Sequence, residues 1–197
     1  MNAETTYPDG NVVTRWTRSH ILLHWAAALL IGTQFVSGQW MSTLFAGKLG
    51  GDVDGAAASY LGPLHIALGT LVFALVAARV RDRVVHGRPP HPPGEPVWAR
   101  RLATVTQFAL YALVLLMPVA GLVAWFGESE SIGDAHAIAA KLLFALLALH
   151  VAGALANHYW FKTDVLRRML PGHGRRTRGS RQPSALTVGG ARDGRDG

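Results

Sequence analysis

The sequence contains no cysteine. Disulfides, iron–sulfur clusters, thioether-attached haem and thiol catalysis are therefore all excluded. Any metal chemistry in this protein has to rest on histidine, methionine or carboxylate side chains. The nine histidines are accordingly the main candidates for metal ligands.

Charged residues are also scarce, since Asp, Glu, Lys and Arg make up 16% of the chain against roughly 25% in soluble domains. Apolar residues are gathered into four stretches, each long enough for the about 20 residues that a membrane-spanning helix requires. These stretches are 20–44, 60–80, 102–126 and 136–161. The first is too long for the core of a signal peptide and carries two histidines, so we expect it to be retained as a helix. The pattern predicts an all-α integral membrane protein.

Basic residues are distributed unevenly along the chain. All but two of the 19 Lys and Arg residues lie near the start of the first stretch, around the connection between the second and third, or after the fourth. The positive-inside bias therefore predicts that both termini are cytoplasmic. Short outer connections favour an up-down-up-down four-helix bundle that crosses the membrane several times. The net charge of +7 is explained by this distribution, which argues against a nucleic-acid partner.

Three regions are expected along the chain. Residues 1–14 form an N-terminal polar segment, and residues 15–171 form the single transmembrane domain. Residues 172–197 are rich in Gly and Arg and have too little apolar surface to repay the cost of ordering. We expect this basic tail to be disordered.

Four histidines lie within the apolar stretches or at their edges, where an unpartnered imidazole is costly. They are His24, His65, His136 and His150. His136 and His150 are 14 residues apart, which in a helix is 40° short of four turns and about 21 Å of rise. They therefore face the same way near opposite membrane surfaces.

The expected topology places His24 at the cytoplasmic level with His150, and His65 at the outer level with His136. Two cross-helix pairs at two depths suit two haems, each with two axial imidazole ligands on its iron. Gly69 would leave room for a flat ring. For any single histidine, the alternative role is a hydrogen bond to a neighbouring helix. A structural zinc site is not expected, because its four ligands must converge on one ion and these histidines lie at two levels.

Four segments of the sequence match a known pattern: LLHW, LHIALG, LYALVLLMPVAGL and LHVAGALANHYWFKTDVLRRMLP. Through them the chain resembles, over residues 15–171, the bacterial diheme cytochrome b561 family, and the resemblance implies a multi-pass protein of the bacterial inner membrane. The resemblance implies two haem b groups on His24, His65, His136 and His150. It further implies exchange of electrons with ubiquinone or a related quinone, with a quinone site near the segment after the last ligand. His158 in that segment is the candidate for bonding a quinone carbonyl.

The sequence leaves three hypotheses for the function. The first is an electron carrier between a donor, such as a redox partner protein, and the quinone pool. The second is a superoxide:ubiquinone oxidoreductase, which the resemblance implies for some members, although the outer connections carry five acidic residues against Lys48. The third is a haem-free membrane anchor or transporter. Lys141, inside the fourth stretch, either pairs with a haem propionate or extends to the outer interface.

Overall fold

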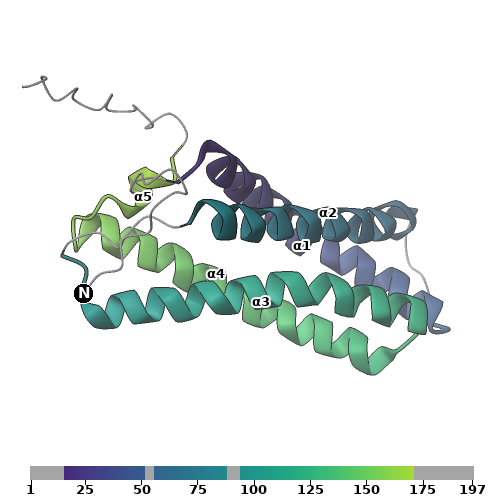
Figure 1. The fold of residues 1–197 in the computed structure, drawn as a ribbon. Coiled ribbons are helices and arrows are strands. Elements are labelled where there is room, and N and C mark those ends of the chain that lie inside the picture. Colours follow the sequence, from purple (N-terminus) through teal and green to yellow (C-terminus); the bar gives the residue numbers. More distant parts are fainter. Residues whose placement is uncertain (1–15, 52–55, 88–93, 171–197) are drawn as a thin grey trace, which may run out of the picture.

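The computed structural model describes residues 16–51, 56–87 and 94–170. The expected polar segment 1–14 and basic tail 172–197 lie outside these residues, as do His91 and His173. In the described part of the chain the secondary structure is helical throughout, with no strand (Figure 1). The helices are α1 (Arg18–Lys48), α2 (Ala56–His86), α3 (Val97–Gly127), α4 (Glu130–Tyr159) and the short α5 (Val165–Arg168).

The first four helices are each long and apolar enough to cross a membrane, which confirms the predicted all-α fold with four spanning helices. All four are longer than the sequence predicted. The largest differences are six residues: α4 begins at Glu130, and α2 continues past residue 80 through Arg83 to His86. The apolar criterion places a boundary at the first charges, whereas long Lys and Arg side chains allow a helix to continue while their charged groups reach the interface.

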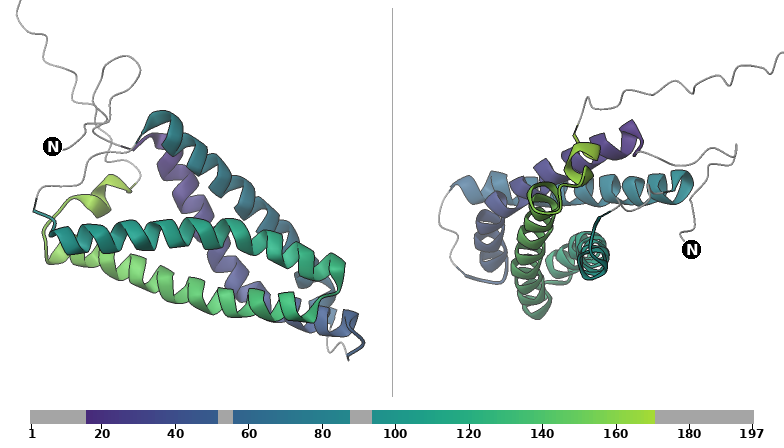
Figure 2. Two further views of the ribbon diagram at one scale, coloured as in Figure 1. Left: turned by 60° about the horizontal axis from the view of Figure 1, so that its bottom comes forward. Right: turned by 90° about the vertical axis from the view of Figure 1, so that its left-hand side faces the viewer.

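Successive long helices run in alternating directions, and α1 lies with α2 while α3 lies with α4 (Figures 1 and 2). Helices α2 and α3 also pack against each other. The starts of α1 and α3 and the ends of α2 and α4 therefore share one end of the bundle, which we call the basic end. The other end, which carries Glu128, Glu130 and Asp134, is called the acidic end.

The exterior of the bundle is apolar. Leu29, Phe108 and Leu116 are 74%, 76% and 65% exposed, and many other large apolar side chains share this surface. Such a surface is unfavourable in water but suits contact with lipid. The buried core is small by comparison, and its residues come from all four helices: Ala27, Val72, Val76, Val114 and Leu143.

The chain after α4 folds back onto α1. Trp25 Nε1 donates a hydrogen bond to the Met169 carbonyl at 2.7 Å. Thr163 Oγ1 donates to the Asn157 carbonyl at 3.0 Å, which closes the turn at the end of α4. Trp25 directly follows His24, so this contact ties the C-terminal turns to the part of α1 that carries a candidate ligand.

Candidate functional site

The four candidate ligands form two pairs of facing rings. The rings of His24 on α1 and His150 on α4 have centroids 6.3 Å apart with planes inclined at 67°. The rings of His65 on α2 and His136 on α4 have centroids 6.4 Å apart with planes inclined at 74°. We call His24 and His150 the basic-end pair, and His65 and His136 the acidic-end pair. Because α4 supplies one member of each, about 21 Å of helix rise separates the two pairs.

The separation within each pair fits a shared metal ion. An imidazole nitrogen binds a metal at about 2 Å and lies about 1.1 Å from its ring centre, so two rings across one ion have centres about 6.2 Å apart. Both pairs are within a few tenths of an ångström of this value. Direct hydrogen bonding between two imidazoles would bring the rings closer, because an N···N contact is about 3 Å.

The acidic-end pair is oriented by neutral hydrogen-bond partners. His136 Nδ1 lies 3.0 Å from the Met117 carbonyl oxygen, to which it donates. His65 Nδ1 lies 2.9 Å from Ser37 Oγ. With Nδ1 engaged in each ring, Nε2 is left to face the partner ring, which is the usual arrangement for metal-binding histidines.

A cavity of about 310 Å³ adjoins the acidic-end pair and is lined by residues from all four long helices. Its size lies at the lower end of the range for small-molecule and cofactor sites. Four glycines contribute to the lining: Gly38, Gly69, Gly121 and Gly133. A Cβ at Gly121 would lie 3.2 Å from Cε1 of His136, so a larger residue there would press on the ring. The absence of side chains at these positions suits a flat macrocycle.

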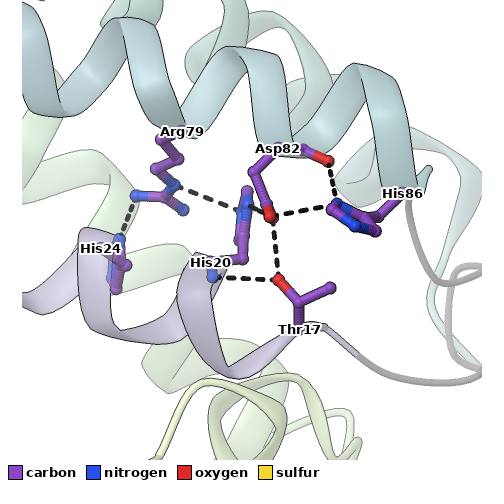
Figure 3. A network of polar contacts seen from close by, with 6 residues as sticks. All are labelled: Thr17, His20, His24, Arg79, Asp82 and His86. Atoms are coloured by element: carbon purple, nitrogen blue, oxygen red, sulfur yellow. Dashed lines mark hydrogen bonds and ion pairs between the residues drawn. The ribbon is translucent and has the colours of Figure 1, made fainter.

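The basic-end pair lies beside a charged network on α1 and α2 (Figure 3). Arg79 contacts Nδ1 of His24, and its Nε donates to His20 Nε2 at 3.2 Å. His20 Nδ1 lies 3.2 Å from Asp82 Oδ2. The same carboxylate accepts from Thr17 Oγ1 at 2.8 Å and from His86 Nδ1 at 3.1 Å.

His20 is fully buried within this network. Its ring stacks on Trp16 with centroids 4.2 Å apart, and both of its nitrogens have partners. It therefore positions Arg79 and Asp82. Among the described residues it does not face a second histidine across a ligand-sized gap, although it lies one turn before His24.

Two further residues singled out from the sequence lie away from the pairs. Lys141 is exposed on the surface of α4 and does not line the cavity. His158 lies in the last turn of α4, and its ring packs edge-on against Tyr159 with centroids 4.8 Å apart. Its Nδ1 is buried with no hydrogen-bond partner among the described residues.

Sequence reasoning missed Arg79, which it assigned to the connection after the second span. A signal was available, because Arg79 follows His65 by 14 residues, the spacing that relates His136 to His150. Residues with this spacing share a helix face about 21 Å apart. The spacing therefore predicts that Arg79 lies on the same face of α2 as His65, at the level of the basic-end pair.

Comparison with known proteins agrees with this architecture. The family model described as prokaryotic cytochrome b561 matches residues 15–172. The chain belongs to this family. Haem b binding, electron transfer and a multi-pass position in the bacterial inner membrane follow for the chain as a cytochrome b561. Membership therefore argues against the haem-free anchor or transporter.

Several curated relatives align with this cytochrome b561 over nearly their whole length. Cytochrome b562 of Cereibacter sphaeroides is 32% identical over 79% of this chain and 94% of its own. Cytochrome b561 homolog 1 of Escherichia coli is 25% identical over 81% and 98%. The probable superoxide oxidase CybB of Yersinia pestis is 22% identical over 76% and 92%.

Proposed function

We propose that this cytochrome b561 is a diheme electron carrier, with one haem b between His24 and His150 and a second between His65 and His136. The observation that carries this proposal is the pair of ring separations, 6.3 and 6.4 Å, at two depths in one bundle. Haem ligated by two imidazoles supplies one-electron transfer and leaves no open position on iron for substrate. The basic end would face the cytoplasm, because Lys and Arg concentrate there.

The residues of the chain perform three tasks in this proposal. The four histidines would hold the two haem groups, and α4 would fix the distance between the two sites because it carries one histidine of each. Ser37 and the Met117 carbonyl hold the acidic-end rings in position. The apolar exterior keeps both sites within the bilayer and away from bulk water.

A quinone is the proposed exchange partner, at the basic end near His158. The unpartnered Nδ1 of His158 could hydrogen-bond a quinone carbonyl. A shallow depression on the same turns of α4 is lined by Leu155, Ala156, Tyr159 and Trp160. Tyr159 and Trp160 are 72% and 83% exposed, as expected for aromatic side chains at a membrane interface. A lipid-soluble ring could therefore approach the turns of α4 next to His158 from the membrane.

The test combines haem quantitation with quinone kinetics on the purified full chain. We expect two haems per chain and two one-electron steps in a redox titration. His158→Gln should slow electron exchange with a short-chain ubiquinone by about tenfold or more, the effect of about 1.4 kcal/mol, while haem content stays at the wild-type value. One haem per chain would contradict the diheme proposal, and an unchanged quinone rate would contradict the role of His158.

Superoxide:ubiquinone oxidoreduction is the second candidate, and it rests on the similarity to the probable superoxide oxidase CybB. The acidic end offers little attraction to an anion. Lys48 there lies 3.5 Å from the Glu128 carboxylate and donates to the Trp125 carbonyl at 2.6 Å. A superoxide pulse that reduces the haems, with quinone as the final acceptor, would support this activity. Haems that stay oxidised through the pulse would reject it.

A further inference from the structure

Two guanidinium groups lie close together at the basic end of α2. Arg79 and Arg83 are one helical turn apart, and both lie over the Tyr111 ring, with each Cζ 5.8 Å from the ring centroid. Like charges at this spacing are unfavourable. Neither arginine forms an ion pair with a carboxylate of the described residues, and the buried Nη1 of Arg83 has no hydrogen-bond partner among them.

The nearby carboxylate forms no ion pair with either arginine among the described residues. Asp82 is occupied by Thr17, His20 and His86, which approach it at 2.8 to 3.2 Å. A charge held in a membrane-spanning bundle is costly unless a partner of opposite sign is present. The two arginines together therefore carry more positive charge than the single nearby carboxylate can balance.

The contact between Arg79 and His24 also points to a missing partner. For His24 to present Nε2 to a metal, its proton must reside on Nδ1. An N–H at Nδ1 cannot donate to the guanidinium of Arg79, which is itself a donor. When His24 serves as a ligand, the outer nitrogens of Arg79 consequently need a different acceptor, while Nε stays on His20.

We propose that Arg79 and Arg83 form an anion site beside the basic-end pair and that this site binds a propionate carboxylate of the haem held there. Arginine pairs with carboxylates through two parallel hydrogen bonds, which suits a group presented at the rim of a flat ring. The chain from Asp82 through His20 fixes the Nε side of Arg79, so that its Nη1 is directed toward His24 (Figure 3). This inference rests on the diheme proposal.

The test compares Arg79→Gln and Arg83→Gln with Arg81→Gln in the purified haem-loaded protein. Arg81→Gln removes the same charge from an exposed position on the same helix. Resonance Raman spectra report the bending of the haem propionates, and redox titration reports the midpoint of each haem. The basic-end haem is identified as the component lost in His24→Ala.

We expect Arg79→Gln to shift the propionate bending band of the basic-end haem and to lower its midpoint, because loss of a cation favours the oxidised form. A tenfold change in the ratio of reduced to oxidised haem corresponds to about 59 mV for one electron. Arg79→Lys should restore the midpoint potential to near its wild-type value, because the charge is kept, but it should not restore the position of the propionate bending band. Arg83→Gln should act in the same direction, and it serves as the second variant if Arg79→Gln fails to accumulate.

An unchanged propionate band in both Gln variants would overturn the inference. A wild-type midpoint that depends on added inorganic phosphate or on anionic lipid would also overturn it, since an exchangeable anion would then occupy the site. If the wild type holds two haems while the band is unaffected, the inference fails alone. If it holds fewer than two, the diheme proposal fails as well, so the two failures are distinguishable.

Discussion

The two histidine pairs have the same internal spacing but different surroundings. The acidic-end pair is held by a hydroxyl and a main-chain carbonyl and adjoins a glycine-lined cavity. The basic-end pair is bordered by Arg79, and through it by His20 and Asp82. The bundle thus contains two similarly spaced histidine pairs in different surroundings. A glycine-lined cavity borders one pair, and charged side chains border the other. Substitutions should therefore affect one site and spare the other.

The largest effect is expected where space is restricted. Gly121→Leu would place a side chain against His136, whose Cε1 is already 3.2 Å from the position of a Cβ. We expect loss of the acidic-end haem with retention of the other, measured as haem per chain and by the remaining absorption spectrum. Gly127→Leu on the same helix is the control, because a Cβ at Gly127 meets nothing within 4 Å. Full haem content in Gly121→Leu would contradict the position of this site.

Ser37→Ala tests the polar support of the acidic-end pair. Removing the partner of His65 Nδ1 should weaken retention of that haem by about tenfold, the lower end of the effects seen when partners of metal ligands are removed. The rate at which this haem is transferred to added apomyoglobin measures its retention. Thr33→Ala, whose hydroxyl donates only to the Leu29 carbonyl of its own helix, should have no such effect. Equal loss of both haems in Ser37→Ala would show that the support is not local.

Asp82→Ala tests the charged network. Loss of the carboxylate removes the acceptor of the part-buried Thr17 hydroxyl and the partner of the buried His20 ring, which should lower the free energy of unfolding by about 1–3 kcal/mol. Thermal unfolding in mild detergent checks this. Asp164→Ala removes an exposed partner of Arg168 and should cost well under about 1 kcal/mol. The basic-end haem should show the larger spectral change in Asp82→Ala, and a change confined to the acidic-end haem would contradict the network.

The smallest effect is expected from Lys141→Ala. The side chain is exposed on α4, so we expect both haem midpoints to stay at their wild-type values in a redox titration. A shift of either midpoint would place Lys141 at a propionate, the partner considered from the sequence.

Much of the fold could be predicted from the sequence because a bilayer imposes long apolar helices. The two histidine pairs also followed from helical period and alternating direction, and the structure brings the same residues together; their role as ligands stays a prediction. The position of Lys141 was open to the same reasoning. It follows His136 by five residues, about 140° around the helix, so it lies away from the face that carries the histidines.

Other features depended on three-dimensional packing. The contacts of Ser37 with His65 and of Met117 with His136 result from how the helices cross, which no local pattern records. The Asp82 network was hidden because α2 continues beyond its apolar stretch. A charged residue at the edge of a membrane span can belong to a loop or to the site. Only its contacts with the neighbouring helix distinguish the two cases.

The central claim is that each haem is shared by one specified pair of histidines. The most direct test is to record absorption spectra of four single variants, His24→Ala, His65→Ala, His136→Ala and His150→Ala. We predict that each variant retains one haem, that His24→Ala and His150→Ala leave the same residual spectrum, and that His65→Ala and His136→Ala leave the other. A shared residual spectrum for His24→Ala and His65→Ala would contradict the pairing.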